Sequence, residues 1–461
     1  MNIKTYKLAE LLTQYREIHF VENDQDYKQI TISKYSGVSY RGTKNGKHIG
    51  RKRQFIVNLR KYPHTLLFTR QGVKDGSIGI APKDVDGCIA TENMPMFSIN
   101  TKIILPELLA SWLNSEECKT QLDSITPTGS AQKAIHERDL LKIHVSIPEN
   151  IEDQKKLINI LKNKKEAIEY LNSEIQNQSA YLTKLRQSIL QEAIEGKLTL
   201  KWRKEHPICK GNPDYDAETL LEKIQVEKEK LIKEEKNCPS GRRVKKKKAL
   251  VPIKAEEIPF KLPNGWVWTK LGEICSKIGS GSTPKGSNYT TEGYPFFRSQ
   301  NIYDSGLLYD DIKYISNSVH KNMHGTVVLK NDLLLNITGG SLGRCALVPN
   351  DFKEGNVSQH VCIIRTILSN HNYFHFLILS PLFQSYVFNS TTGAGRKGLP
   401  KYNLELFLIP LPPLAEQQAI VDRVEKLLAI VDELEKQVIE RKEQSEQLMQ
   451  AVLREAFEGG K

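Results

Sequence analysis

The chain has 461 residues, of which 39% are hydrophobic and 26% charged, so its length allows about three domains that each bury a core. No apolar run reaches the ~18 residues of a membrane helix, and the first residues lack the basic head and apolar core of a signal peptide. The formal charge of +12, from 66 Lys and Arg against 54 Asp and Glu, favours a polyanionic partner such as nucleic acid. The seven cysteines form no C-x-x-C pair, which predicts reduced thiols in a cytoplasmic protein and neither a zinc site nor a disulfide framework.

Residues 1–147 are predicted to form a first mixed globular head. Its β-type runs, such as YKQITIS and RQFIVNL, are separated by glycine and asparagine turns. The segment GTKNGKHIGRKR (42–53) gathers six basic side chains and three glycines. A flexible basic loop suits DNA, because lysine and arginine bind phosphates and arginine also matches guanine edges; the alternative is a solvated hairpin tip. The DNA-binding candidates in this head are Lys44, Arg51, Lys52, Arg53 and, from the loop TGSAQK, Gln132 and Lys133.

Residues 148–197 are predicted to form a long helix with a coiled-coil seam. Apolar residues recur every 3.5 positions on average, and Lys164 and Gln178 are polar interruptions of the same register. About 40 residues at 1.5 Å each make a rod of roughly 60 Å, which a partner helix of similar length covers best. Packing of the helix on its own head is the alternative. The helix-pairing candidates are Leu161, Ile168, Leu171, Ile175, Leu182, Leu185 and Ile189.

Residues 198–262 are predicted to be a charged connector that contains one helix, LLEKIQVEKEKLIKEE. Two patterns in it resemble catalytic motifs. NPDY (212–215) lacks the second proline of an adenine methyltransferase loop and has no donor-binding loop before it, so we interpret it as a turn that starts a helix. Asp214 followed by Glu234 and Glu235 matches an acidic nuclease pattern, but a solvated charged helix is a poor place for a metal site.

Residues 263–411 are predicted to form a second mixed head, with strands in TVVLKNDLLLNI and QHVCIIR. FFRSQNI supplies arginine, glutamine and asparagine, the side chains that match base edges with two hydrogen bonds; the alternative is an ordinary polar strand end. GSGSTPKGS (279–287) lacks the residue order of a phosphate-binding loop, so nucleotide binding is not expected. The DNA-binding candidates in this head are Thr283, Lys285, Arg298, Gln300, Asn301, Arg344, Arg396 and Lys397.

Residues 412–461 are predicted to form a second long helix, preceded by prolines that favour its start. Its apolar positions follow a 4-3-4-3-4 spacing and resume after two polar positions. Its helix-pairing candidates are Ile420, Val424, Leu427, Val431, Leu434, Val438, Leu448 and Val452.

The two halves of the chain repeat one another with an offset near 264 residues, in collinear order, which predicts two copies of one unit of about 190 residues. Pro148 is matched with Pro412, and Gln154 with Gln418. The matched segments are KLAE with KLGE, GSIG with GSLG, TGSAQKAI with TGAGRKGL, and IPENIEDQ with LPPLAEQQ. The predicted fold class is therefore α+β, with two mixed heads, two long helices and an internal pseudo-twofold repeat.

The sequence resembles the specificity subunits of type I restriction–modification systems. The resemblance is carried by LIPLPPLAEQQAIV, by ILQEAIEGKL and VLREAFEGG at the ends of the helices, and by TLKWRKEHP and IPFKLPNGWVWTKLGEI. The first head departs from the pattern, because nothing like LPNGW precedes KLAE. The resemblance implies two target recognition domains that each bind half of a split double-stranded DNA sequence, and an antiparallel helix pair that sets their spacing.

The resemblance also implies partners: two methylation subunits, which transfer a methyl group from S-adenosylmethionine to adenine N6, and a restriction subunit that cuts DNA using ATP and Mg²⁺. This chain itself is expected to hold no catalytic residue, metal or cofactor. Two alternatives to a DNA-specificity subunit remain at this point, namely an enzyme that modifies or cuts DNA alone and a structural coiled-coil protein that does not bind DNA.

Overall fold

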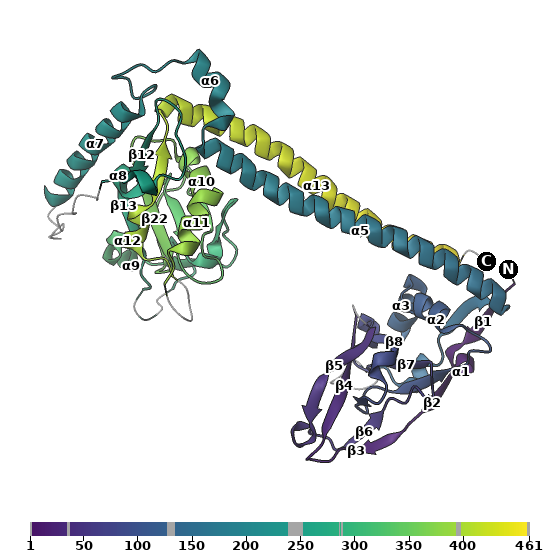
Figure 1. Ribbon diagram of the computed structural model, residues 1–461. Helices are drawn as coiled ribbons and strands as arrows, with labels where there is room; N and C mark the ends of the chain where they lie inside the picture. The colour runs from purple at the N-terminus through teal and green to yellow at the C-terminus, as the bar shows by residue number, and fades with distance from the viewer. Residues whose placement is uncertain are drawn as a thin grey trace. The chain divides into compact units, whose positions relative to one another are not determined.

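The computed structural model describes residues 2–34, 37–126, 134–237, 252–284, 286, 289–392 and 398–458 (Figure 1). The chain divides into two compact units. Unit 1 comprises Met1–Gln178 and Gln437–Lys461, and unit 2 comprises Ser179–Lys436. Two long helices, α5 (Ile151–Ile194) and α13 (Leu414–Glu458), contribute one part to each unit. No helix among the described residues is both long enough and apolar enough to cross a membrane.

Unit 1 contains three sheets. A short antiparallel pair joins β1 (Ile3–Lys7) to β11 (His144–Pro148), the strand that leads into α5. A four-stranded sheet has the order β2 (Leu12–Tyr15), β10 (Met96–Ile99), β7 (Thr65–Phe68), β8 (Ile78–Ile80). A five-stranded sheet has the order β3 (Ile18–Phe20), β6 (Arg53–Ile56), β9 (Ile89–Ala90), β4 (Asp26–Ser33), β5 (Gly37–Asn45). The short helices are α1 (Leu8–Leu11), α2 (Pro106–Leu113), α3 (Glu116–Ser124) and α4 (Glu137–Leu140).

Unit 2 repeats this plan. β12 (Val267–Lys270) pairs with β23 (Leu408–Leu411), the strand that leads into α13. A four-stranded sheet has the order β13 (Cys275–Ser280), β22 (Val361–Thr366), β19 (Leu333–Asn336), β20 (Cys345–Leu347), and a second has the order β17 (Lys313–Ile315), β14 (Tyr294–Phe297), β21 (Gly355–Val357), β18 (Val327–Val328). A small hairpin joins β15 (Ile302–Tyr303) to β16 (Gly306–Leu307). The helices are α6 (Leu200–Glu205), α7 (Ala217–Asn237), α8 (Leu271–Ile274), α9 (Asn317–Asn322), α10 (His371–Leu379), α11 (Pro381–Asn389) and α12 (Lys401–Leu406).

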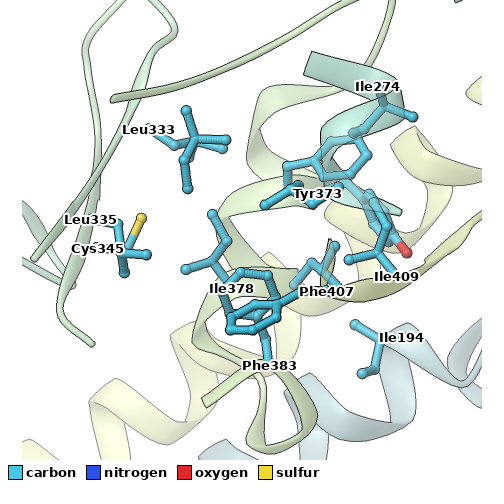
Figure 2. Packing of buried hydrophobic residues seen from close by; sticks show 14 of the residues in the cluster. Ile194, Ile274, Leu333, Leu335, Cys345, Tyr373, Ile378, Phe383, Phe407 and Ile409 are labelled. Atoms are coloured by element: carbon cyan, nitrogen blue, oxygen red, sulfur yellow. The ribbon is translucent and has the colours of Figure 1, made fainter. Parts of the chain in front are cut away.

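The core of each unit combines a sheet face with helices from distant parts of the chain. In unit 2, Figure 2 shows Tyr373, Ile378 and Phe383 of α10 and α11 packed among strand residues such as Leu333, with Ile194 from the end of α5 on the same core. In unit 1, Leu161 and Ile168 of α5 and Phe457 of α13 join the core that contains Trp112. Burial of this apolar surface is the main stabilising term in each unit.

The repeat predicted from the sequence is present in the topology. In the sheets β2-β10-β7-β8 and β13-β22-β19-β20, strands at equivalent positions follow one another in the same order along the chain. GSLG lies between β19 and β20, and GSIG begins before β8 and ends within it, at the equivalent connection. The match of Gln154 with Gln418, however, is displaced by one residue. Gln154 and Gln417 are each the fourth residue of their long helix, and each donates through Nε2 to the carbonyl of the preceding proline, Pro148 at 2.8 Å and Pro412 at 3.0 Å. The connection after Pro412 is one residue shorter than the connection after Pro148, which a constant offset does not reveal.

The two long helices pair antiparallel within each unit. In unit 1, Lys164 contacts Glu455 at 2.9 Å, Asn172 contacts Ser445 at 2.8 Å and Gln178 contacts Arg441 at 3.1 Å. In unit 2, Arg186 contacts both Asp432 and Glu435. Residue numbers fall along α13 as they rise along α5. Lys164 and Gln178, the polar interruptions of the α5 seam, therefore contact polar residues of α13.

Most of the predicted seam residues are covered, but not all of them. Leu182, Leu427 and Val438 are half-buried. Leu171, Leu185, Leu434 and Leu448 are 39–48% exposed, because a two-helix pair covers only the side chains that point directly at the partner. The buried seam residues are Leu161, Ile168, Ile175, Ile189, Ile420, Val424, Val431 and Val452.

Within unit 2, one buried carboxylate links the connector to α13. Glu416 of α13 is 1% exposed and pairs with Arg203 of α6. The same carboxylate accepts hydrogen bonds from Thr199 Oγ1 at 2.7 Å and from Trp266 Nε1 at 2.7 Å. Trp266 belongs to the LPNGW lead-in of the second head. These three donors satisfy a charge that would otherwise be costly to bury.

Candidate nucleic-acid interface

Several polar segments of unit 2 lie together at one end of its two main sheets. Ser280, the last residue of β13, pairs with Cys362 near the start of β22, and Asn336, the last residue of β19, pairs with Val361. Strand β14 ends beside β21, where Ser358 N donates to Phe297 O at 2.9 Å. We call this end the strand-end face of unit 2; it comprises residues 281–284, 298–301, 337–344 and 359–360.

The backbone at this face is closely packed. A Cβ at Gly281 would lie 1.8 Å from the carbonyl oxygen of Val357, so only glycine fits there. Thr338 Oγ1 lies 2.7 Å from His360 Nδ1, and Thr338 also bridges to Gly398. The face therefore consists of short loops that are anchored on the ends of rigid strands. Proteins commonly place binding residues on such loops.

Arg298 and Gln300 meet at one carboxylate on this face. Gln300 Nε2 donates to Asp311 Oδ2 at 3.0 Å, and Arg298 Nη2 donates to the same oxygen at 3.2 Å and to the Asp311 carbonyl at 2.5 Å. Lys313 Nζ lies 3.0 Å from Asp311 Oδ1. The hydrogen bond from Lys313, followed by that from Arg298, holds the pKa of Asp311 below its usual range.

Asn301 occupies a different environment from its two neighbours. Its side chain is fully buried, and its Oδ1 accepts from the Arg298 backbone at 3.1 Å while its Nδ2 donates to the Leu308 carbonyl at 3.0 Å. We therefore correct the expectation for Asn301: it shapes the turn that presents Arg298 and Gln300, and it has no side-chain surface for a base.

The remaining candidates of unit 2 are distributed around the same face. Arg344 is exposed, and its guanidinium stacks 4.8 Å from the ring centre of Tyr303. Thr283 is exposed beside Gly281. Lys285, Arg396 and Lys397 lie outside the described residues.

In unit 1, the corresponding ends of β2 and β10 border a cleft of about 200 Å³. Arg53 is one of its lining residues, and both Arg53 and Arg51 lie within 3.6 Å of the Glu92 carboxylate. Arg70 makes two hydrogen bonds to Glu137, at 2.5 and 3.2 Å. Burial, the largest single influence, would raise the pKa of Glu137. The hydrogen bonds from Arg70, a backbone hydrogen bond and the positive charges of Arg70 and Arg16 together outweigh burial and hold the pKa below its usual value. The arginines at this cleft are thus paired with neighbouring carboxylates.

The segment 42–53 is more ordered than the flexible loop expected from its sequence. β5 extends to Asn45 and a 3-10 turn, Gly46–His48, follows it. Lys52 Nζ donates to Gly46 O and to Asn23 Oδ1, both at 2.6 Å, so this amine ties the turn to the head. Lys44 is exposed on β5, whereas Gln132 and Lys133 lie outside the described residues.

Sequence reasoning missed the residues that hold the candidate arginines, and it missed Arg70. Glu92, Glu137 and Asp311 are single carboxylates outside any recognisable motif. Arg70 directly follows the apolar run TLLF of β7 and a threonine, at the strand end that faces the cleft. The signal that identifies Arg70 is an arginine just beyond a buried strand.

The model of the family described as "Type I restriction modification DNA specificity domain" matches residues 263–444. Residues 263–444 are thus similar to a type I specificity domain. The matched segment extends from β12 into the second half of α13 and includes the whole strand-end face of unit 2. The resemblance inferred from the sequence motifs is thereby confirmed.

Related specificity subunits agree with this assignment. The chain is 27% identical over 281 residues to the "Type I restriction enzyme EcoAI specificity subunit" of Escherichia coli, an alignment that covers 59% of this chain and 44% of the relative. It is 29% identical over 229 residues to the EcoBI specificity subunit of Escherichia coli, covering 48% of this chain and 47% of the relative. The chain thus spans about half the length of the curated relatives that it matches.

A solved chain described as "Structural basis underlying complex assembly and conformational transition of the type I R-M system" superposes with a TM-score of 0.59. The superposition covers 99% of this chain and 97% of the solved chain at 18% sequence identity. At that identity the likeness shows the fold, and it supports the α+β architecture with two heads and two long helices.

Proposed function

We propose that the chain is the non-catalytic specificity subunit of a type I restriction–modification complex and reads a bipartite double-stranded DNA target. Each head would recognise one half of the target. The observation that carries the proposal is the repetition of one sheet, β2-β10-β7-β8 and β13-β22-β19-β20, with an arginine and an amide near the corresponding strand ends. These are Arg70 and Gln14 in unit 1, and in unit 2 Arg298 and Gln300, which follow β14 of the neighbouring sheet. These side chains supply the donors and acceptors that base edges require.

The long helices would serve two roles in the complex. The paired helices connect the two heads, and this connection would determine the gap between the two half-sites of the DNA target. The partly exposed leucines of the seam form an apolar surface on which helices of methylation subunits would pack. In unit 2 these residues are Leu185, 44% exposed, and Leu434, 39% exposed; in unit 1 they are Leu171 and Leu448.

The chemistry of the complex would belong to its other subunits. Two methylation subunits would transfer a methyl group from S-adenosylmethionine to adenine N6, and a restriction subunit would cut DNA with ATP and Mg²⁺. The complex would act in the cytoplasm, where its DNA target is found. The proposed boundaries are 1–147 and 263–411 for the recognition heads, 148–197 and 412–461 for the helices, and 198–262 for the connector.

The decisive experiment is sequencing of methylated adenines in cells that express this chain with its cognate methylation subunit, compared with cells that express the methylation subunit alone. We expect a split motif that depends on this chain. Replacement of residues 263–411 by the head of another specificity subunit should change one half of that motif and leave the other. A change in both halves, or no motif from co-purifying soluble proteins, would contradict the proposal.

A single-residue test addresses the strand-end face directly. Arg298→Ala should weaken or relax recognition at one position of the half-site read by unit 2. The matched control is Lys321→Ala in α9, which packs near the opposite end of β14, where His320 stacks on Tyr294 at 3.8 Å. If Arg298→Ala and Lys321→Ala changed the methylated motif equally, the result would contradict DNA recognition by the strand-end face. Methylation or cleavage of DNA by the purified chain alone would favour an enzyme.

A further inference from the structure

Asp311 is the acidic centre of an otherwise basic and amide-rich part of the strand-end face. It lies in the loop between β16 and β17, and its backbone is left-handed with φ +53°. Its side chain is 61% exposed, yet both carboxylate oxygens are used, by Arg298, Gln300 and Lys313. An exposed carboxylate on a DNA-facing surface repels phosphate, so its presence needs a compensating role.

The carboxylate constrains what Gln300 presents to a ligand. An ionised carboxylate only accepts hydrogen bonds, so the Gln300 group that faces it must be the NH₂ and not the carbonyl. The 3.0 Å contact from Nε2 to Asp311 Oδ2 therefore fixes the side-chain amide in one of its two orientations. The carbonyl oxygen Oε1 and the second N–H of the amide are left for a base edge.

The same carboxylate limits Arg298. The side chain is 24% exposed, and its guanidinium is held at Nη2 by both the carboxylate and the backbone carbonyl of Asp311. Two hydrogen bonds from one nitrogen fix the plane of the group, and Nη1 remains available as a donor. Asn301 helps to hold the loop that carries Asp311 in place, because its Nδ2 donates to the carbonyls of Leu308 and Asp310 in that loop.

We infer that Asp311 is a positioning residue that holds Arg298 and Gln300 as one reading unit for two neighbouring bases. Arg298 would donate to an acceptor-rich edge such as guanine N7 and O6. Gln300 would offer its carbonyl oxygen to a base that donates, such as adenine N6 or cytosine N4. Without the carboxylate the Gln300 amide is free to rotate by half a turn, and discrimination between donating and accepting bases at its position is lost. This inference rests on the proposed function.

Unit 1 contains a similar combination at its own strand ends. Glu137 accepts two hydrogen bonds from Arg70 and a longer one, 3.4 Å, from Gln14 Nε2. The pair Arg70–Glu137 is more buried than Arg298–Asp311, with 26% and 13% of the two side chains exposed. A carboxylate that holds one arginine and one glutamine thus occurs in both heads, although the two carboxylates lie at unrelated positions in the sequence.

The test measures the affinity of the assembled complex, with its methylation subunits, for duplexes that carry the target defined by adenine methylation and for single-base-pair variants of it. Asp311→Gly removes the carboxylate and keeps the left-handed backbone, which glycine adopts without strain. It should reduce discrimination about tenfold at two adjacent positions of the half-site read by unit 2, within the range of a good bidentate base contact. These positions should be those affected individually by Arg298→Ala and Gln300→Ala. The half-site read by unit 1 should be unaffected.

Asp310→Asn is the matched control, because it removes one negative charge from the adjacent exposed residue, for whose side chain the structure gives no hydrogen bond or ion pair. Unchanged discrimination in Asp311→Gly would overturn the inference. So would an equal rise in affinity for every duplex in both Asp311→Gly and Asp310→Asn, which would make Asp311 only a source of repulsion. A wild-type complex without any sequence preference would instead refute the proposed function, so the two failures are distinguishable.

Discussion

Ser445 of α13 donates a hydrogen bond from Oγ to Asn172 Oδ1 of α5 at 2.8 Å, and Ser445 is only 2% exposed. This contact is one of several polar contacts within the mostly apolar seam of the helix pair. A polar pair in a coiled coil costs stability relative to leucine but specifies register, because any slip of the helices leaves both groups unpaired. The contacts of Gln178 with Arg441 and of Lys164 with Glu455 extend the same register along unit 1.

Ser445→Ala should therefore lower the free energy of unfolding by about 1 kcal/mol, because it leaves Asn172 without its partner in the seam. Urea denaturation measures this change, and a double-mutant cycle with Asn172→Ala isolates the energy of the pair. Ser173→Ala, on an exposed position of α5, is the control and should be neutral. An additive double mutant would show that the two side chains do not depend on one another.

The sequence predicted these helices well because their signal is local and repeated many times. Apolar periodicity identified residues 148–197 and 412–461, and α5 and α13 lie within those ranges. Periodicity does not tell how much of a side chain one partner helix covers, so Leu171 and Leu185 look the same as Ile168 and Ile189 in the sequence, although their burial differs. The degree of exposure depends on the angular position of each side chain around the pair.

The candidate interface was less predictable, because its decisive contacts join residues far apart in the chain. Arg70 and Glu137 are separated by 67 positions, and no motif links them. The base-matching residue types in FFRSQNI predicted DNA contacts for Arg298 and Gln300, whose side chains both contact Asp311 on the strand-end face. The same criterion was wrong for Asn301, because asparagine is as well suited to closing a turn as to binding a base, and only the three-dimensional structure shows which role it has.

Loss of the Glu416 carboxylate should destabilise unit 2 strongly. Glu416→Ala leaves Arg203, whose side chain is 16% exposed, without its counter-charge, and leaves Trp266 Nε1 without an acceptor. Breaking a buried ion pair from one side typically costs about 3–5 kcal/mol. Chemical denaturation followed by tryptophan fluorescence should show a loss of that size.

Glu425→Ala, on an exposed position of the same helix, is the control and should change the unfolding free energy little. Glu416→Gln should fall between wild type and Glu416→Ala, because the amide oxygen still accepts from Trp266 while the charge is lost. If Glu416→Ala is as stable as the control, the connector is not anchored by this carboxylate.

The Arg70–Glu137 pair should make the stability of unit 1 depend on pH. The folded-state pKa of Glu137 lies below its ordinary value of 4.5, so the folded protein holds this proton less tightly than the unfolded chain does. The pair therefore stabilises the fold above pH 4.5, and the contribution is lost as the pH falls through the lowered folded-state pKa. At pH 7, Glu137→Gln should be less stable by about 2 kcal/mol, the scale of a charge-assisted hydrogen bond.

Urea denaturation of both proteins between pH 7 and pH 3 tests this linkage. The stability difference between wild type and Glu137→Gln should be constant above pH 5 and shrink below pH 4. A difference that does not vary with pH would show that the variant acts by altered packing and not by loss of the charge.

The partly exposed leucines of the helix pair should be more important for assembly than for folding. Leu185 and Leu434 are about two-fifths exposed, whereas Val431 on the same helix as Leu434 is 1% exposed. Leu185→Glu with Leu434→Glu should leave the thermal midpoint within a few degrees of wild type, since these side chains keep access to water, and should weaken binding of the methylation subunit at least tenfold. Val431→Glu should instead disrupt the helix pair itself, because it buries an unpaired charge.

Co-purification with the methylation subunit and thermal unfolding of the free chain separate these effects. Gln187→Glu with Lys436→Glu is the control, because it adds acidic side chains two positions further along each helix, on the other side of it, where both residues are exposed. Loss of partner binding in the control as well would mean that added negative charge, and not the loss of apolar surface, prevents docking. Normal binding by the leucine variant would mean that the methylation subunit binds elsewhere on the chain.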